Sequence, residues 1–97
     1  MSLTYNEEEL DAIEHYSGLF FSPVDIATIL EKDSIEFLED YKNNFGNVKS
    51  KYQKGYLVAQ AKLRSKLILL AIDGSNTAIS DVLKILTNLN KELIKYE

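Results

Sequence analysis

Apolar residues recur at steps of three and four through most of the chain, and no segment alternates apolar and polar residues for long enough to form a strand. This spacing predicts an all-α protein of about five helices. About residues 6–46 should form a helix-turn-helix-like three-helix front half, and about residues 48–96 a long antiparallel helical hairpin. Because 97 residues can enclose one modest core, we expect residues 1–97 to be a single domain.

Helix start signals divide the front half. Asn6 is a favourable N-cap, so the first helix should begin there and end near Gly18. Ser22 followed by Pro23 supplies an N-cap and a first-position proline for the second helix. A short turn at residues 31–33 then leads to the third.

The third helix should be capped by Asp33 or Ser34 and closed by Gly46. Its apolar face is predicted to comprise Ile35, Phe37, Leu38, Tyr41 and Phe45. A bracing helix followed by two short helices around a tight turn is the arrangement of helix-turn-helix domains. Helical proteins that never contact DNA also contain such turns.

A single long helix is predicted from Val48 to Asp73. Only Gly55 interrupts it, at a cost of about 1 kcal/mol relative to alanine. Residues 67–72 (LILLAI) are apolar on all sides, so we expect the front half, the last helix or another chain to bury them. Gly74 suits the end of this helix, and the next one should begin at Ser75 or Asn76.

The last helix carries a heptad-like line of apolar residues, which we call the apolar seam: Ile79, Val82, Leu86, Leu89, Leu93 and Tyr96. Folding back onto the long helix would cover this seam once, and the apolar residues beside it would then need a second partner. We therefore expect a homo-oligomer. The candidate interface residues are Leu67, Ile68, Leu70, Ile72, Ile85, Leu86, Leu89, Leu93 and Ile94.

The net charge of −4 conceals a strong asymmetry. Residues 1–40 hold eleven carboxylates against Lys32 alone, whereas residues 41–97 hold ten Lys or Arg against four carboxylates. The simplest interpretation is solvated helix faces and self-complementary packing. The alternative is that the basic half meets a polyanion or the acidic end of a neighbouring subunit.

Nothing in the sequence predicts catalysis, and we expect no metal and no cofactor. The chain has no cysteine, its four glycines form no phosphate-binding loop, and His15 has no assignable nucleophile beside it. The clustered carboxylates fit solvated helix surface better than a metal cage. The N-terminus does not resemble a secretory signal, and the longest apolar run is far shorter than a membrane span, so a cytoplasmic, membrane-free location is expected.

Several short motifs together resemble a known family. They are LFFSPVDIATIL at residues 19–30, the aromatic third helix at 35–38, YQKG at 52–55, and AKLRSKLILLAIDGSNTAISDVL at 61–83. Over roughly residues 10–88 the chain resembles the DNA-binding small subunits of phage terminases and, more broadly, homeodomain-like phage and prophage helix-turn-helix proteins.

This resemblance implies a protein that binds duplex viral DNA and assembles as an oligomer in the bacterial cytoplasm. It would present the DNA to a packaging motor subunit and carry no nuclease or ATPase chemistry of its own. The chain departs from base-reading proteins in its third helix, where Glu36, Glu39 and Asp40 outnumber Lys42.

Backbone contacts by the basic stretch at 42–54 are therefore a better expectation than groove reading. The candidate DNA-contacting residues are Lys32, Ser34, Lys42, Asn43, Asn44, Lys49, Lys51 and Lys54. The alternative hypothesis is a protein-interaction module that keeps the helix-turn-helix shape and uses its acidic face to bind a basic protein partner.

Overall fold

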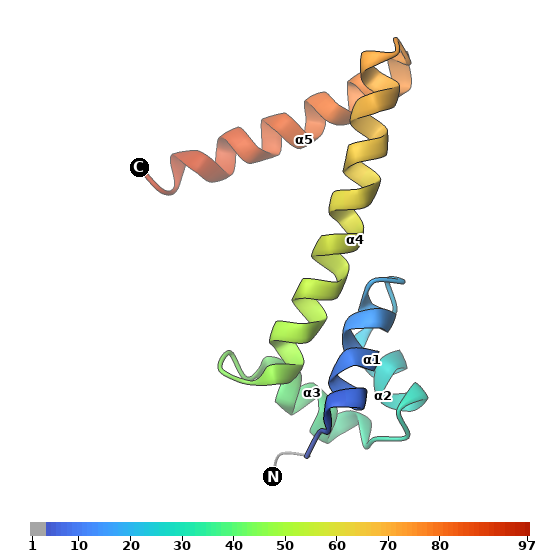
Figure 1. Cartoon of the computed structure of the whole chain (residues 1–97). Helices are drawn as coiled ribbons and strands as arrows, with labels where there is room; N and C mark the ends of the chain where they lie inside the picture. The colour runs from blue at the N-terminus through green and yellow to red at the C-terminus, as the bar shows by residue number, and fades with distance from the viewer. Residues whose placement is uncertain (1–3) are drawn as a thin grey trace. The chain divides into compact units, whose positions relative to one another are not determined.

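The structure is a computed structural model and describes residues 4–97. Within this range the chain forms helices and no strand, as predicted for an all-α protein (Figure 1). The helices are α1 (Glu7–Ser17), α2 (Pro23–Ile29), α3 (Ser34–Lys42), α4 (Asn47–Ile72) and α5 (Asn76–Ile94). The chain divides into two compact units, Met1–Gln60 and Ala61–Glu97.

The predicted N-caps form where the sequence placed them. At α1 the Glu9 amide donates to the Asn6 side chain (2.8 Å) and the Asn6 amide donates to the Glu9 carboxylate (3.1 Å), which completes a capping box. At α2 the Ser22 hydroxyl accepts from a backbone amide. At α3 the Asp33 carboxylate accepts from two amides at 3.0 Å. Each cap satisfies donors that a helix start leaves open.

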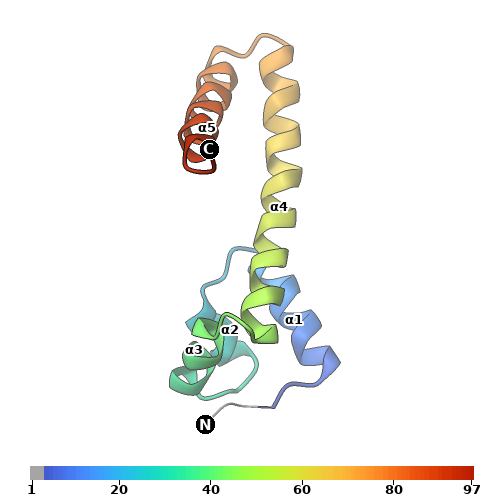
Figure 2. The same ribbon diagram turned by 90° about the vertical axis from the view of Figure 1, so that its left-hand side faces the viewer.

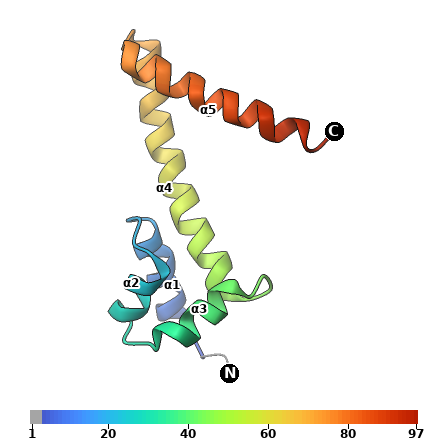
Figure 3. The ribbon, with the colours of Figure 1, turned by 180° about the vertical axis from the view of Figure 1, so that it is seen from behind.

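The core of the first unit takes residues from four helices. Its buried members are Ile13, Ile26, Ala27, Phe37 and Val48. Burying a large apolar side chain of this kind contributes about 1.5–3 kcal/mol. Figures 1 and 3 show α1, α2 and α3 gathered around the beginning of α4. The helix-turn-helix-like front half therefore uses the start of the long helix as a fourth core element.

Gly55 lies at a close helix crossing and not at a helix end or kink. A Cβ built at this position would overlap the Ser17 hydroxyl and the Glu14 carbonyl oxygen of α1. On the α1 side, a Cβ at Gly18 would lie 3.3 Å from the Gly55 carbonyl oxygen. Glycine is required here because the two backbones approach too closely for any side chain.

The end of α3 differs from the prediction. The helix stops at Lys42, because Asn43 adopts an extended conformation and its side chain accepts from the Phe45 amide at 3.1 Å. Phe45 therefore lies in the turn before α4 and is 97% exposed, and Ile35 is 70% exposed. The prediction that these two residues belong to the buried face of α3 is wrong, as is the closing role assigned to Gly46.

The border between the two units falls inside α4, later than the sequence suggested. Val48 is buried in the first core, Tyr52 packs against it, and Gly55 contacts α1. The first turns of α4 therefore belong to the first unit by packing. The predicted separation near residues 46–48 follows the loop, whereas the structural separation follows the core.

The second unit begins with the last part of α4 and reverses at a tight turn (Figure 2). Gly74 adopts a left-handed conformation (φ 100°), as expected at a helix C-terminus. The Ser75 hydroxyl then accepts from the Ala78 amide at 3.3 Å and caps α5. The predicted turn and N-cap are confirmed.

The apolar seam is not covered within this unit. After the turn, α5 leaves the adjoining end of α4 instead of lying along it (Figures 1 and 3). Leu86, Leu89 and Leu93 are each nearly half exposed. The close hairpin packing expected from the sequence is therefore absent, and Ala78 is the buried residue of α5. The second unit thus leaves these three leucines open to solvent.

The Gly55 crossing yields a prediction about stability. Replacing Gly55 with Ala improves helix propensity by about 1 kcal/mol, but the new methyl group would strike the backbone of α1. Overpacking of this kind costs about 1–3 kcal/mol or more, so we expect net destabilisation and a melting temperature lowered by several degrees.

Thermal unfolding followed by circular dichroism checks this expectation. Gly46→Ala is the matched control, because a Cβ there meets its nearest atom at 3.4 Å, an ordinary contact. A Gly55→Ala variant as stable as the wild type would show that α1 and α4 do not cross as closely as described.

Candidate nucleic-acid and self-association surfaces

The predicted DNA-contacting residues fall into three groups with different partners. Lys32 lies beside the start of α1, Lys51 and Lys54 lie beside its middle and end, and residues 42–49 span the end of α3, the loop after it and the start of α4. Ser34 stands apart from these groups, at the start of α3. The structure therefore divides the basic residues of the first unit between acidic neighbours and a segment without carboxylates.

Lys32 is held by α1 and the segment before it. Its ammonium group forms an ion pair with Glu9 at 2.7 Å and donates to the Thr4 carbonyl oxygen at 3.4 Å. It also lies 5.5 Å from the ring centre of Tyr5. The hydrogen bond to Lys32, followed by the one from the Asn6 amide, lowers the pKa of Glu9 below its ordinary value. These contacts give Lys32 a structural role that its isolated position in the sequence did not indicate.

Lys51 and Lys54 face carboxylates of α1. The Glu14 carboxylate lies 3.8 Å from the Lys51 ammonium and 3.7 Å from that of Lys54. The Asp11 carboxylate lies 3.9 Å from Lys51. The spacing of the two lysines on α4 places both beside Glu14. Most of the positive charge that the sequence assigned to a DNA surface at 51–54 is thus compensated within the protein.

We call residues 42–49 the basic connection. Lys42, Asn43 and Asn44 are exposed. The Lys49 ammonium donates to the Asn44 side chain at 2.8 Å and lies 5.9 Å from the ring centre of Tyr41. No acidic residue occurs in this segment. It is the best-placed phosphate-binding candidate of the first unit.

Asp40, which the sequence suggested would repel DNA, does not face solvent. It is 8% exposed, and the Tyr5 hydroxyl donates to its carboxylate at 2.8 Å. Burial and this hydrogen bond raise the pKa of Tyr5 well above its ordinary value. On the same helix Glu39 remains exposed and the candidate Ser34 is neutral, so α3 carries no positive charge before Lys42 at its end.

The tyrosines at the base of α4 are engaged internally. Tyr52 packs edge-on against Tyr41 (5.2 Å between ring centres), and its hydroxyl donates to the Phe21 carbonyl oxygen at 2.8 Å. Burial raises the pKa of Tyr52. Tyr56 adjoins the same cluster. These rings pack at the rim of the first core, so Tyr52 is engaged within the protein and is not presented as a base-stacking platform.

The predicted interface residues lie in the second unit and are mostly exposed. Ile72 is 74% exposed, Ile94 is 66% exposed, and the remaining members range from partly buried to about half exposed. The interface set named from the sequence thus remains accessible on the chain, including the run at 67–72 that was expected to be covered. Large apolar side chains exposed in this number are typical of a protein–protein interface.

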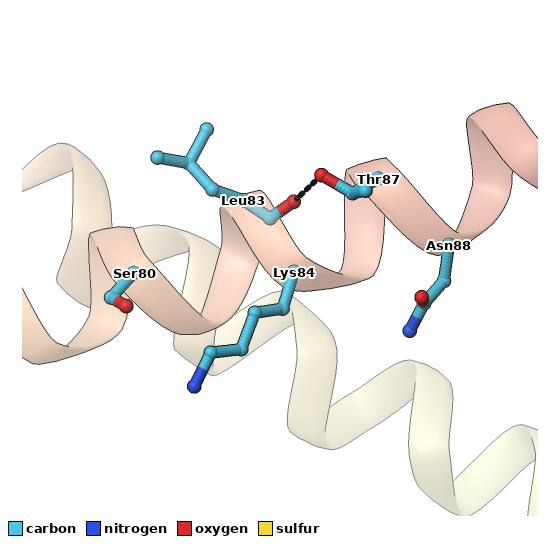
Figure 4. Close-up of a pocket in the computed structure, with 5 residues that line it drawn as sticks. All are labelled: Ser80, Leu83, Lys84, Thr87 and Asn88. Atoms are coloured by element: carbon cyan, nitrogen blue, oxygen red, sulfur yellow. Dashed lines mark hydrogen bonds between the residues drawn. The ribbon is translucent and has the colours of Figure 1, made fainter.

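A shallow open depression lies along α5. Its lining comprises Ser80, Leu83, Lys84, Thr87 and Asn88 (Figure 4). The Thr87 hydroxyl donates to the Leu83 carbonyl oxygen at 2.8 Å, an ordinary bond within the helix. The close-up shows no converging set of polar groups, so this depression does not resemble a ligand site.

Within residues 4–97 no helix is long and apolar enough to cross a bilayer, and no group of three or more His, Cys, Asp or Glu could hold a metal ion. Comparison with family models, curated proteins and solved structures gives no match for the chain. The assignment of function therefore depends on the residues and geometry described above.

The contacts of Glu9 predict a pH effect on stability. Because the folded-state pKa of Glu9 lies below its ordinary value of 4.5, its contribution is present above that pH and is lost as the pH falls through the lowered pKa. Glu9→Gln should therefore be less stable than the wild type at pH 7, and the difference should shrink as the solution becomes more acidic.

Urea unfolding at a series of pH values between neutral and strongly acidic measures this difference. Glu8→Gln is the control, because Glu8 is exposed on the same helix and forms no ion pair in the structure. A stability difference for Glu9→Gln that is constant over the whole pH range would contradict the assigned role.

The exposed seam predicts self-association. The wild-type protein should exceed its monomer mass of 11.1 kDa in light scattering, and the triple variant Leu86→Gln, Leu89→Gln, Leu93→Gln should be monomeric. Because these leucines are already exposed, the variant should keep its helix content. The control replaces Lys84, Asn88 and Lys91 with Ala on other faces of α5. A wild-type mass of 11.1 kDa at all concentrations would overturn the prediction.

Proposed function

We propose that this protein is a non-catalytic, oligomer-forming DNA-binding protein of the terminase small-subunit type. In this role the first unit contacts duplex DNA through its basic connection and the second unit joins copies of the chain. Two observations support the proposal. The motifs resemble that family, and the helical core and the apolar seam lie in separate compact units. A packaging motor subunit would be the partner that receives the DNA.

The observation that carries this proposal is the exposed seam on α5. A helix that leaves Leu86, Leu89 and Leu93 nearly half exposed gains stability when a second apolar surface covers them. Self-association is the simplest source of that surface, because each copy presents the same seam. Assembly is therefore the activity that the chain's own geometry supports best.

Oligomer formation also compensates for a weak DNA surface. One chain offers only Lys42 and Lys49, with neighbouring asparagines, as basic-connection groups outside ion pairs with carboxylates. Two phosphate contacts give low affinity by themselves. Several linked copies on one duplex raise the overall affinity without any new contact, because later contacts form within one complex.

An acidic-face alternative has its own supporting observation. Asp25, Glu31 and Glu39 are exposed on the first unit, and residues 1–40 carry eleven carboxylates against one lysine. Such a surface suits a basic protein partner better than a phosphate backbone. It becomes the preferred function if duplex DNA does not bind.

Duplex binding can be measured by fluorescence anisotropy with a short labelled DNA of mixed sequence. We expect affinity to fall between about 50 and 200 mM salt, with a slope of about −0.9 for each phosphate neutralised. Replacing Lys42 and Lys49 with Gln should reduce affinity at least about tenfold in the oligomer, since each copy loses both contacts.

The matched control replaces Lys91 and Lys95 of the last helix region with Gln, which removes the same charge from the second unit. Equal losses in the two double variants would indicate a net-charge effect. No binding by the wild type or by variants with fewer carboxylates in about 50 mM salt would overturn DNA binding and favour the acidic-face alternative.

A further inference from the structure

Two carboxylates of α1 compete with DNA for the lysines of α4. We define the acidic clamp as Asp11 and Glu14, the α1 residues whose carboxylates lie within 4 Å of Lys51 or Lys54. We propose that the acidic clamp is a built-in inhibitor that masks these two lysines and limits the DNA affinity of the first unit. This inference rests on the proposed function.

The geometry of the clamp follows from the close helix crossing. The Glu14 carbonyl oxygen is one of the atoms that a Cβ on Gly55 would overlap. The same residue's carboxylate lies 3.8 Å from Lys51 and 3.7 Å from Lys54. The backbone contact thus fixes Glu14 beside both ammonium groups. Moving the carboxylate away by displacing α1 would open the core around Ile13.

The ion pairs are protected unequally from solvent. Lys51 and Glu14 side chains are each 34% exposed, whereas Lys54 is 64% and Asp11 is 76% exposed. Coulomb attraction is stronger where less water surrounds the charges. Of the two lysines, Lys51 is therefore the one held more strongly away from DNA phosphates, and Glu14 is the principal member of the clamp.

The masking acts on phosphate in two ways. A phosphate that approaches Lys51 or Lys54 must displace a carboxylate that is already paired, and it must also stay close to the negative charge of that carboxylate. Because the pairs have no hydrogen bond between their partners, neutral amides of the same shape would leave the fold intact and release the ammonium groups. The clamp therefore changes affinity without a requirement for unfolding.

The test compares wild type with Asp11→Asn, Glu14→Gln in the same anisotropy titration, using a labelled duplex of mixed sequence. We expect the double variant to bind at least about fivefold more tightly in low salt. The slope of affinity against salt should also steepen by about 1–2, because Lys51 and Lys54 now neutralise phosphates. The gain in affinity depends on the two released lysines. Adding Lys51→Gln and Lys54→Gln to the double variant should therefore cancel it.

Glu7→Gln, Glu8→Gln is the matched control. It removes the same charge from the same helix, and neither residue pairs with a lysine in the structure. Circular dichroism establishes that all variants are folded, and the single variant Glu14→Gln provides a second form if the double variant is unstable. It should show a smaller gain in the same direction.

The outcomes separate this inference from the proposed function. Binding by the wild type with no gain in the clamp variant overturns the clamp and leaves DNA binding standing. An equal gain in the Glu7, Glu8 control also overturns it, since net charge would then explain the effect. Binding only by the clamp variant supports both ideas, and no binding by any variant overturns both.

Discussion

The contact between α1 and α4 at Gly55 is the constraint on which the first unit depends. The missing side chain lets the α4 backbone approach Ser17 and Glu14 more closely than any other residue would permit. This approach draws Val48 and Tyr52 into the same core as Ile13. The first turns of the long helix thus become part of the front unit. Without the crossing, α1 would lose its contact with α4, and Lys51 and Lys54 would lose their acidic neighbours.

That crossing also changes how the charges of the chain are understood. In the sequence, an acidic front and a basic rear suggest two surfaces directed at different partners. In the structure, Lys51 and Lys54 lie against Glu14, and Lys32 lies against Glu9. Partly exposed pairs of this kind stabilise a fold only modestly. Their larger effect is electrostatic: they leave the basic connection as the segment of the first unit most open to a polyanion.

The second unit presents the opposite situation, with apolar surface and no internal cover. Leu86 and Leu89 lie on a helix whose own unit buries little beyond Ala78. Removing these apolar side chains from water would stabilise the chain. A division between an acidic unit whose lysines are partly paired and a unit whose apolar seam is uncovered is well suited to a protein that acts as several copies. Assembly and ligand contact would then use different residues.

Four helix starts could be predicted from local signals, because the side chains of Asn6, Ser22, Asp33 and Ser75 accept hydrogen bonds from backbone amides no more than three residues away, and Gly74 adopts its left-handed turn. Features that depend on residues distant in the sequence became visible only in the folded chain. It buried Asp40 against Tyr5, placed Phe45 in solvent, left the apolar seam uncovered, and turned Gly55 from an apparent weakness into a crossing point. Periodicity shows that a face is apolar, but only the packed chain shows what covers it.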